Sequence, residues 1–310
     1  FGDALSSDLI NTLRINPALL GKDKVANLEV FSNKAVAVRE VLRVPQGGSV
    51  HITAEGISIG ADIEAPSGSI VLDAHRNELP GRSPDPLNVV VADGVVLSAR
   101  GAWVNELRGV PTGSGEVALV HGGKITLTAV DNVALGQNTL LDVTGGGRLK
   151  VDGRGSVIAG NGGEINLSGH AVSGVTEENM HGYGIGKGGT LTVSSNKIRI
   201  GGTPDSTAGT VNLGAAFFER GGFADVNLAG IDNVTLCEGV RIKPAVLSLE
   251  LQTDYTLRPS GGRVEDFTRQ VKLDDLVRQP ANLSLTAKNT ADGTGDLSIG
   301  TGARIEADPR

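Results

Sequence analysis

The chain has 310 residues, enough for a large core, but aromatic residues make up only 3% of it, against 45 glycines. This composition argues against an ordinary globular enzyme core and favours an interior of Ile, Leu, Val and Ala, with glycine at corners. The net charge is −7 and Lys and Arg form no cluster, so we expect no nucleic-acid partner and no patch for anionic membranes. No apolar run reaches about 18 residues, so we also expect no transmembrane helix.

Residues 1–27 are the part of the chain least like the rest. Leu5, Leu9 and Leu13 recur at helical spacing, and Pro17 follows them. We predict a short N-terminal helix that packs on the body of the protein or caps it.

A repeat of about 20 residues runs through residues 28–243. AVAV at 35–38 matches GISI at 56–59, and GSV at 48–50 matches GSI at 68–70. Apolar and polar residues alternate in short runs, as on a strand with one buried face, and Gly, Asn or Asp separates the runs. Strands this short suit a coil in which each turn stacks on the one before. We therefore predict an all-β fold, a right-handed parallel β-helix (β-solenoid) with coils of about 20 residues.

Residues 122–168 show the pattern most clearly. In this stretch we predict that Leu127, Leu149 and Leu167 point inward in one aliphatic column. The glycine runs at 145–147 and 160–163 are predicted to be tight corners, because neither leads into a helix or into the Gly-Lys-Ser/Thr of a phosphate loop.

Several segments interrupt the repeat. Residues 75–88 contain three prolines, which do not fit a central ladder, and we predict loop excursions there and at 105–121 and 171–187. Residues 244–281 are predicted to form a longer excursion outside the coil. Residues 282–310 resume the alternation and are predicted to be a returning coil.

Three phrases stand out, namely GVVLSARGAWVNEL, the repeated GGxIxLxA and RQPANLSLTAKNTADGTGDLSIGTGARIEADP. With them the chain resembles the large exoproteins of filamentous-haemagglutinin type, which are exported by two-partner secretion. The likeness covers most of residues 28–308. It implies a right-handed β-helix shaft, export through an outer-membrane partner, and a role in adhesion, biofilm cohesion or toxin presentation. The chain begins at Phe1 without Met and ends within the pattern, so we expect an internal piece of a longer protein, without its secretion domain.

One compact group of His and acidic residues stands out, consisting of His170, Glu177, Glu178, His181 and Tyr183. Imidazole and carboxylate are metal ligands, but this spacing matches no closed metal motif. We expect no metal and no cofactor. Binding residues concentrate on loops held by a rigid scaffold, so we predict that these five residues contact a cell, glycan or matrix polysaccharide.

Asp131, Asp142 and Asp152 lie in or near predicted corners and would be candidate catalytic acids if they aligned on one face, since glycoside hydrolysis needs paired carboxylates. Asp more often caps corners by accepting backbone N–H groups, and we predict that role here. Cys237, the only cysteine, is predicted to be a small buried hydrophobe.

These observations predict an adhesive, non-catalytic shaft of a secreted protein at the bacterial cell surface. Two alternatives stay open, namely a polysaccharide lyase or hydrolase with a β-helix fold and the shaft of a contact-dependent toxin-delivery protein.

Overall fold

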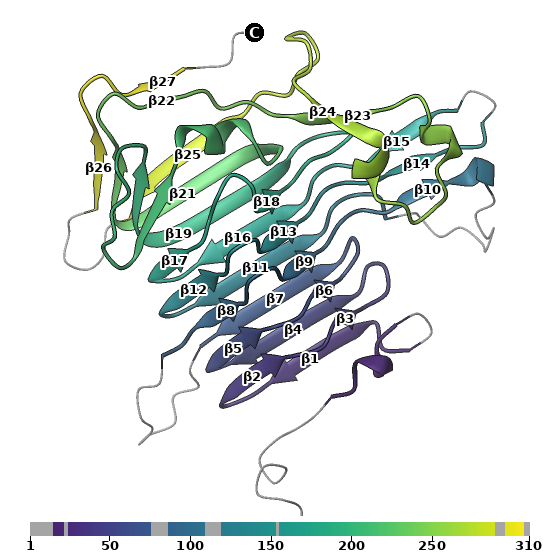
Figure 1. Ribbon diagram of the computed structural model, residues 1–310, viewed down its shortest axis with the longest axis horizontal. Coiled ribbons are helices and arrows are strands. Elements are labelled where there is room, and N and C mark those ends of the chain that lie inside the picture. The colour runs from purple at the N-terminus through teal and green to yellow at the C-terminus, as the bar shows by residue number, and fades with distance from the viewer. Residues whose placement is uncertain are drawn as a thin grey trace, which may run out of the picture.

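The structure is a computed structural model built mainly of short parallel strands that stack in successive coils (Figure 1). The prediction of an all-β parallel β-helix is confirmed. No helix in the described part of the chain is long and apolar enough to cross a membrane. The residues described are 15–21, 24–75, 86–108, 119–152, 155–288 and 295–306. The helices among them are 3-10 turns: η1 (Pro17–Leu19), η2 (Glu106–Arg108), η3 (Ala215–Glu219), η4 (Tyr255–Leu257) and η5 (Val264–Phe267).

One face of the coil is a ten-stranded sheet, which we call the long sheet. Its main strands follow chain order and pair in parallel, so that Ser49 faces Ser69 and Lys124 faces Glu164. These strands are β1 (Asn27–Phe31), β4 (Ser49–Ala54), β7 (Ser69–Ala74), β11 (Lys124–Ala129), β16 (Glu164–Ser168), β19 (Gly189–Ile200), β21 (Phe223–Leu236) and β25 (Asn282–Ala287), with β20 (Thr210–Leu213) beside β19 and β26 (Asp296–Ile299) beside β21.

Two five-stranded parallel sheets close the other faces of the coil. In the first five coils, the chain passes from the long sheet through one strand of the second sheet and one of the third sheet, and then returns (Figure 1). The second sheet contains β2 (Ala35–Val38), β5 (Gly56–Ile59), β8 (Val89–Val91), β12 (Asn132–Leu135) and β17 (Ala171–Ser173). The third sheet contains β3 (Leu42–Arg43), β6 (Ile63–Glu64), β9 (Val96–Ser98), β13 (Leu140–Asp142) and β18 (Met180–His181).

Glycine is required at the corner where the chain returns from the third sheet to the long sheet. Gly48, Gly68, Gly123 and Gly163 stack on one another there, one in each coil. A Cβ added at Gly68 would lie 1.8 Å from the carbonyl oxygen of Gly48, and one at Gly123 would lie 2.0 Å from that of Gly68. Backbones this close leave no room for a side chain, which explains the glycine before β4, β7, β11 and β16.

The core consists of aliphatic rows along the coil axis. Ile125 and Leu127 on β11 point inward between their counterparts on β7 and β16, and both are fully buried. Burial of such a side chain contributes about 1.5 to 3 kcal/mol, and it is complete only when coils stack on both sides. Leu127 and Leu167 are paired neighbours in one row, so this part of the column prediction is confirmed.

Leu149 lies outside this column, so its predicted place there is wrong. Residues 144–152 and 155–163 leave the third sheet, and two strands within them pair in antiparallel fashion beside the coil. These two strands are β14 (Gly147–Leu149) and β15 (Val157–Ala159), and β10 (Trp103–Asn105) pairs in parallel with β14. We call the three strands together the side sheet. Leu149 is fully buried there in a second core. Period-two alternation is the same in a coil and in a hairpin, which explains the error.

Residues 244–281, which we call the strap, leave the stack after β22 (Arg241–Ile242) and fold back over the side sheet (Figure 1). The strap contains an antiparallel hairpin of β23 (Ser248–Leu251) and β24 (Thr268–Val271). Afterwards β25 and β26 pair with β21, and β27 (Arg304–Ile305) pairs with β22. The second core joins strap and side sheet through Trp103, Leu149, Tyr183, Leu249, Val264 and Phe267.

The interpretation of 171–187 as a loop excursion is wrong. These residues include β17, which pairs with β12, and β18, which pairs with β13, so the segment is part of the coil. The segment is rich in glycine and acidic residues, and its two strands are very short, so the sequence pattern did not indicate them. Residues 1–14, where the helical spacing lies, are outside the described residues, as are 76–85 and 109–118 in the other two predicted excursions.

Candidate functional site: an ion-pair network between the strap and the coil

The predicted binding cluster is divided by the fold. His170 is exposed at the corner between the long and second sheets. Glu177 and Glu178 lie in the turn before β18, where Glu178 makes an exposed ion pair of 3.8 Å with Arg220. Only His181 and Tyr183 come together, with ring centroids 5.3 Å apart. The five residues therefore do not form one site.

Strand alternation explains this separation. Val172 and Met180 point into the core and are each 1% exposed, which aims the next residue, His181, outward from the third sheet. There His181 lies beside Asp142 of the preceding coil, and Asp142 lies beside Ser98 of the coil before that. A row of polar side chains thus crosses three coils on the outer face of the third sheet.

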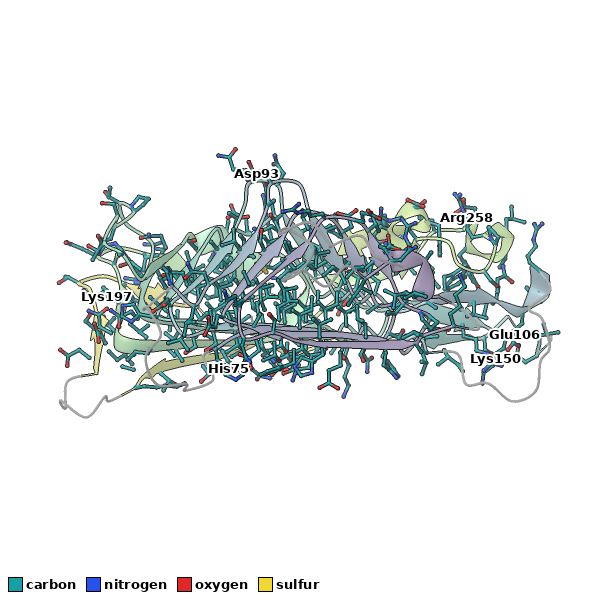
Figure 2. All side chains as sticks on the ribbon, turned by 90° about the horizontal axis from the view of Figure 1, so that it is seen from below. His75, Asp93, Glu106, Lys150, Lys197 and Arg258 are labelled. Carbon is teal, nitrogen blue, oxygen red and sulfur yellow. The ribbon has the colours of Figure 1, made fainter. Side chains whose placement is uncertain are left out.

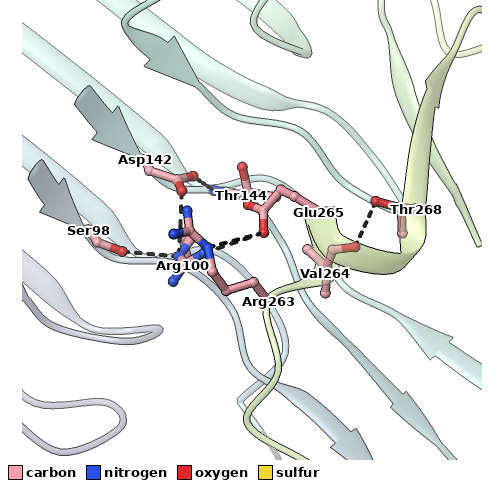
Figure 3. A network of polar contacts seen from close by, with 8 residues as sticks. All are labelled: Ser98, Arg100, Asp142, Thr144, Arg263, Val264, Glu265 and Thr268. Carbon is pink, nitrogen blue, oxygen red and sulfur yellow. Dashed lines mark hydrogen bonds and ion pairs between the residues drawn. The ribbon is translucent and has the colours of Figure 1, made fainter. Parts of the chain in front are cut away.

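Arg100 is the centre of this polar row (Figure 3). Its Nε donates to Ser98 Oγ at 3.2 Å and lies 3.5 Å from Asp142 Oδ2. Its Nη1 lies 3.3 Å from Oε2 of Glu265, which comes from the strap. The other carboxylate oxygen of Asp142 accepts the backbone N–H of Thr144 at 3.0 Å. One guanidinium therefore links two coils to the strap.

The strap lies on this network because its aromatic residues pack on the side sheet. Trp103 and Phe267 are each 1% exposed, with ring centroids 4.8 Å apart. The Trp103 indole N–H donates to the carbonyl oxygen of Arg258 at 3.4 Å, and the Asn105 side-chain amide donates to the same oxygen at 2.7 Å. These contacts hold Glu265 opposite Arg100.

The chemistry of the network is that of an ion-pair bridge. The Asp142 side chain is 2% exposed, and Arg100 lies between it and Glu265. In a glycoside hydrolase the sugar lies between the two catalytic carboxylates, and here Arg100 occupies that place. A carboxylate held this way is neutralised by its partner and positions the backbone around it. The network therefore attaches the strap to the coil.

The other two candidate acids are corner caps. Asp131 accepts the backbone N–H of Leu87 at 2.7 Å, and Asp152 accepts that of Ser156 at 3.3 Å. The prediction that Asp residues accept backbone N–H groups at corners is confirmed for these two and for Asp142, which accepts the N–H of Thr144. Among the described residues no three His, Cys, Asp or Glu side chains gather closely enough to hold a metal ion.

The sequence contained a partial signal for this network. Ser98 and Arg100 are two residues apart on an extended segment, so they share its outer face. Nothing local pointed to Glu265, because it is 165 residues from Arg100 along the chain. Comparison with known proteins adds no assignment, since no protein-family model, no curated protein and no solved structure matches the chain.

Replacing Arg100 with Met is expected to lower the free energy of unfolding by about 3 to 5 kcal/mol, because the buried carboxylate of Asp142 then has no counter-ion. Arg43→Met is the matched control. Arg43 pairs with Glu64 at 3.0 Å on the outer face of the same sheet, but both side chains are exposed, so its loss should cost about 0 to 1 kcal/mol. Chemical denaturation of both variants measures the difference, and equal small losses would show that the network does not stabilise the fold.

Tyr183 predicts a change in stability at alkaline pH. Burial raises the pKa of its phenol above the ordinary value near 10, although the N–H donated by Gly221 partly offsets this. A phenol whose pKa is higher in the folded than in the unfolded protein stabilises the fold. Its full contribution is present below about pH 10, and it is lost as the pH rises through the pKa of the folded protein. Wild type should therefore lose more stability than Tyr183→Phe above about pH 10. The measurement is the urea midpoint against pH for both proteins, and parallel curves would contradict the expectation.

Proposed function

We propose that this chain is a structural and adhesive shaft segment of a large secreted exoprotein at the bacterial cell surface, of the filamentous-haemagglutinin type. The observation that carries the proposal is the continuous aliphatic row inside the long sheet, buried from β4 to β21. Each coil contacts mainly its neighbours, so such a solenoid is rigid along its axis and can be lengthened without redesign of its core. That property suits a shaft that holds a binding surface away from a cell.

The strap adds a second argument for a mechanical role. It covers the outer face of three coils and is attached to them by Arg100, by the aromatic contacts of Trp103 and by the hydrogen bonds of Asn105. A segment that connects several coils resists their separation along the axis. The structure uses its largest side chains for this attachment, with Trp103 and Phe267 the largest of the fully buried ones.

Immunolabelling of intact cells that produce the protein tests the location. An antibody raised against this chain should label the surface of unpermeabilised cells or precipitate the protein from the medium. Signal that appears only after permeabilisation would remove the proposal.

We also propose that the shaft has no catalytic activity, since the ionised side chains of its ion-pair network are engaged with one another. Incubation with plant, algal and bacterial polysaccharides should release no new reducing ends and no unsaturated products. Turnover that is lost in Asp142→Asn and retained in Asp131→Asn would favour the alternative of a polysaccharide lyase or hydrolase.

A further inference from the structure

The outer face of the long sheet has an unusual composition over five consecutive strands. Ten side chains point outward in two rows from β11 to β25, and their registers place them directly beside one another. All are hydroxyl or amide side chains except one alanine, and none is charged, although charged residues make up 20% of the chain. We call this surface the neutral face: Thr126, Thr128, Asn166, Ser168, Thr192, Ser194, Asn227, Ala229, Ser284 and Thr286.

Charged residues of these strands lie at the border of the neutral face. Lys124 and Glu164 occupy the first position of their strands and pair at 3.2 Å, and Asp225 accepts the side-chain amide of Asn282 at 2.7 Å. The outer face of the third sheet differs, since it carries the charged pair of Arg43 and Glu64. A solvated strand surface needs no such separation of charged from uncharged positions.

The geometry of the neutral face is a regular grid. Neighbouring strands in a sheet lie about 4.8 Å apart, and alternate side chains along a strand lie about 6.6 Å apart. The long sheet forms the flat base of the coil (Figure 2). The β-branched threonines have few rotamers, and β11, β16, β19 and β21 are held by ladders on both sides. The hydroxyl groups of these strands are therefore fixed before any ligand arrives, and all except the buried one of Thr126 face outward.

This grid fits an extended neutral polysaccharide. A pyranose unit in an extended chain advances by nearly the spacing between strands, and its hydroxyl groups both donate and accept hydrogen bonds, as Ser, Thr and Asn side chains do. A charged polymer would find no counter-charge within the grid. Each contact is weak by itself, but a polymer that crosses five strands makes many at once, and repeated contacts raise the overall affinity.

We propose that the neutral face binds an extended, uncharged polysaccharide laid across the strands of the long sheet. The inference names a ligand class and a surface for the adhesive role proposed above, and it rests on that role for its biological setting. It also moves the predicted binding surface from residues 171–187 to the long sheet.

The test is binding to microcrystalline cellulose, chitin and a soluble neutral β-glucan, measured as protein removed from solution or as retarded migration. Wild type should bind at least one of them. Thr192→Lys with Asn227→Glu places two long charged side chains on adjacent strands of the face, where they can pair with each other, and should weaken binding at least tenfold. Ser58→Lys with Val90→Glu is the matched control on adjacent strands of the second sheet, and it should bind as wild type does.

A milder variant keeps the test valid if the charged pair disturbs folding. Thr128→Val with Thr192→Val removes two outward hydroxyl groups with little change of shape and should weaken binding about threefold or more. Wild type that binds none of the three polysaccharides, or that binds only the anionic polymer alginate, would overturn the proposal. So would folded variants of the face that bind as tightly as wild type.

The proposal of a surface shaft and the proposal of polysaccharide binding can be distinguished by experiment. Polysaccharide binding that depends on Thr192 and Asn227, in a protein that is absent from the cell surface, would support the neutral face and remove the surface shaft. A surface-located protein without such binding would do the reverse.

Discussion

Leu167→Asp is expected to unfold the central coils at ordinary temperatures. Leu167 is 1% exposed and lies between Leu127 and Val193 in the inner row of the long sheet. The substitution removes a buried aliphatic side chain and places an unpaired carboxylate where no donor is available, with an expected cost above about 5 kcal/mol. That is comparable with the whole stability of many domains. Circular dichroism and urea denaturation measure the loss.

The neighbouring residue supplies the control. Ser168 follows Leu167 on β16 but points outward, between Thr128 and Ser194. Ser168→Asp should change the free energy of unfolding by no more than about 0.5 kcal/mol. Similar effects of the two substitutions would mean that the inward and outward faces of the long sheet have been exchanged.

Phe267→Ala is expected to release the strap while the coil stays folded. Phe267 is 1% exposed and packs against Trp103, and truncation of a buried aromatic side chain costs about 3 to 5 kcal/mol. The loss falls on the contacts between strap and side sheet, so it should appear as local opening. Amide hydrogen exchange of residues 244–281 should accelerate by about a hundredfold or more, while β4, β7 and β11 keep their protection.

Leu276→Ala is the control within the strap. Leu276 is 95% exposed, so its truncation should leave exchange in the strap unchanged. If Phe267→Ala accelerates exchange equally in the strap and in β7, then strap and coil unfold as one unit and the strap is not a separate clamp.

Part of this structure could be predicted because it depends on local rules. Alternation with period two identified the inward positions of strands such as β11 and β16, and the glycines before them marked a corner where backbones of successive coils touch. These features recur from β4 to β16, because each of these strands lies between two similar coils. The all-β solenoid and its aliphatic core therefore followed from composition and pattern.

The sites depended on contacts between distant residues, and only the tertiary structure decided them. Leu149 alternates like any coil residue but belongs to the second core, and the two short strands of residues 171–187 became visible only through pairing with β12 and β13. Arg100 meets Glu265 because the strap folds back across three coils, and neither residue carries a local mark of that contact. Alternation along a strand indicates which of its sides is buried. The order in which coils stack, and the place where the strap folds back, decide which residues that side packs against.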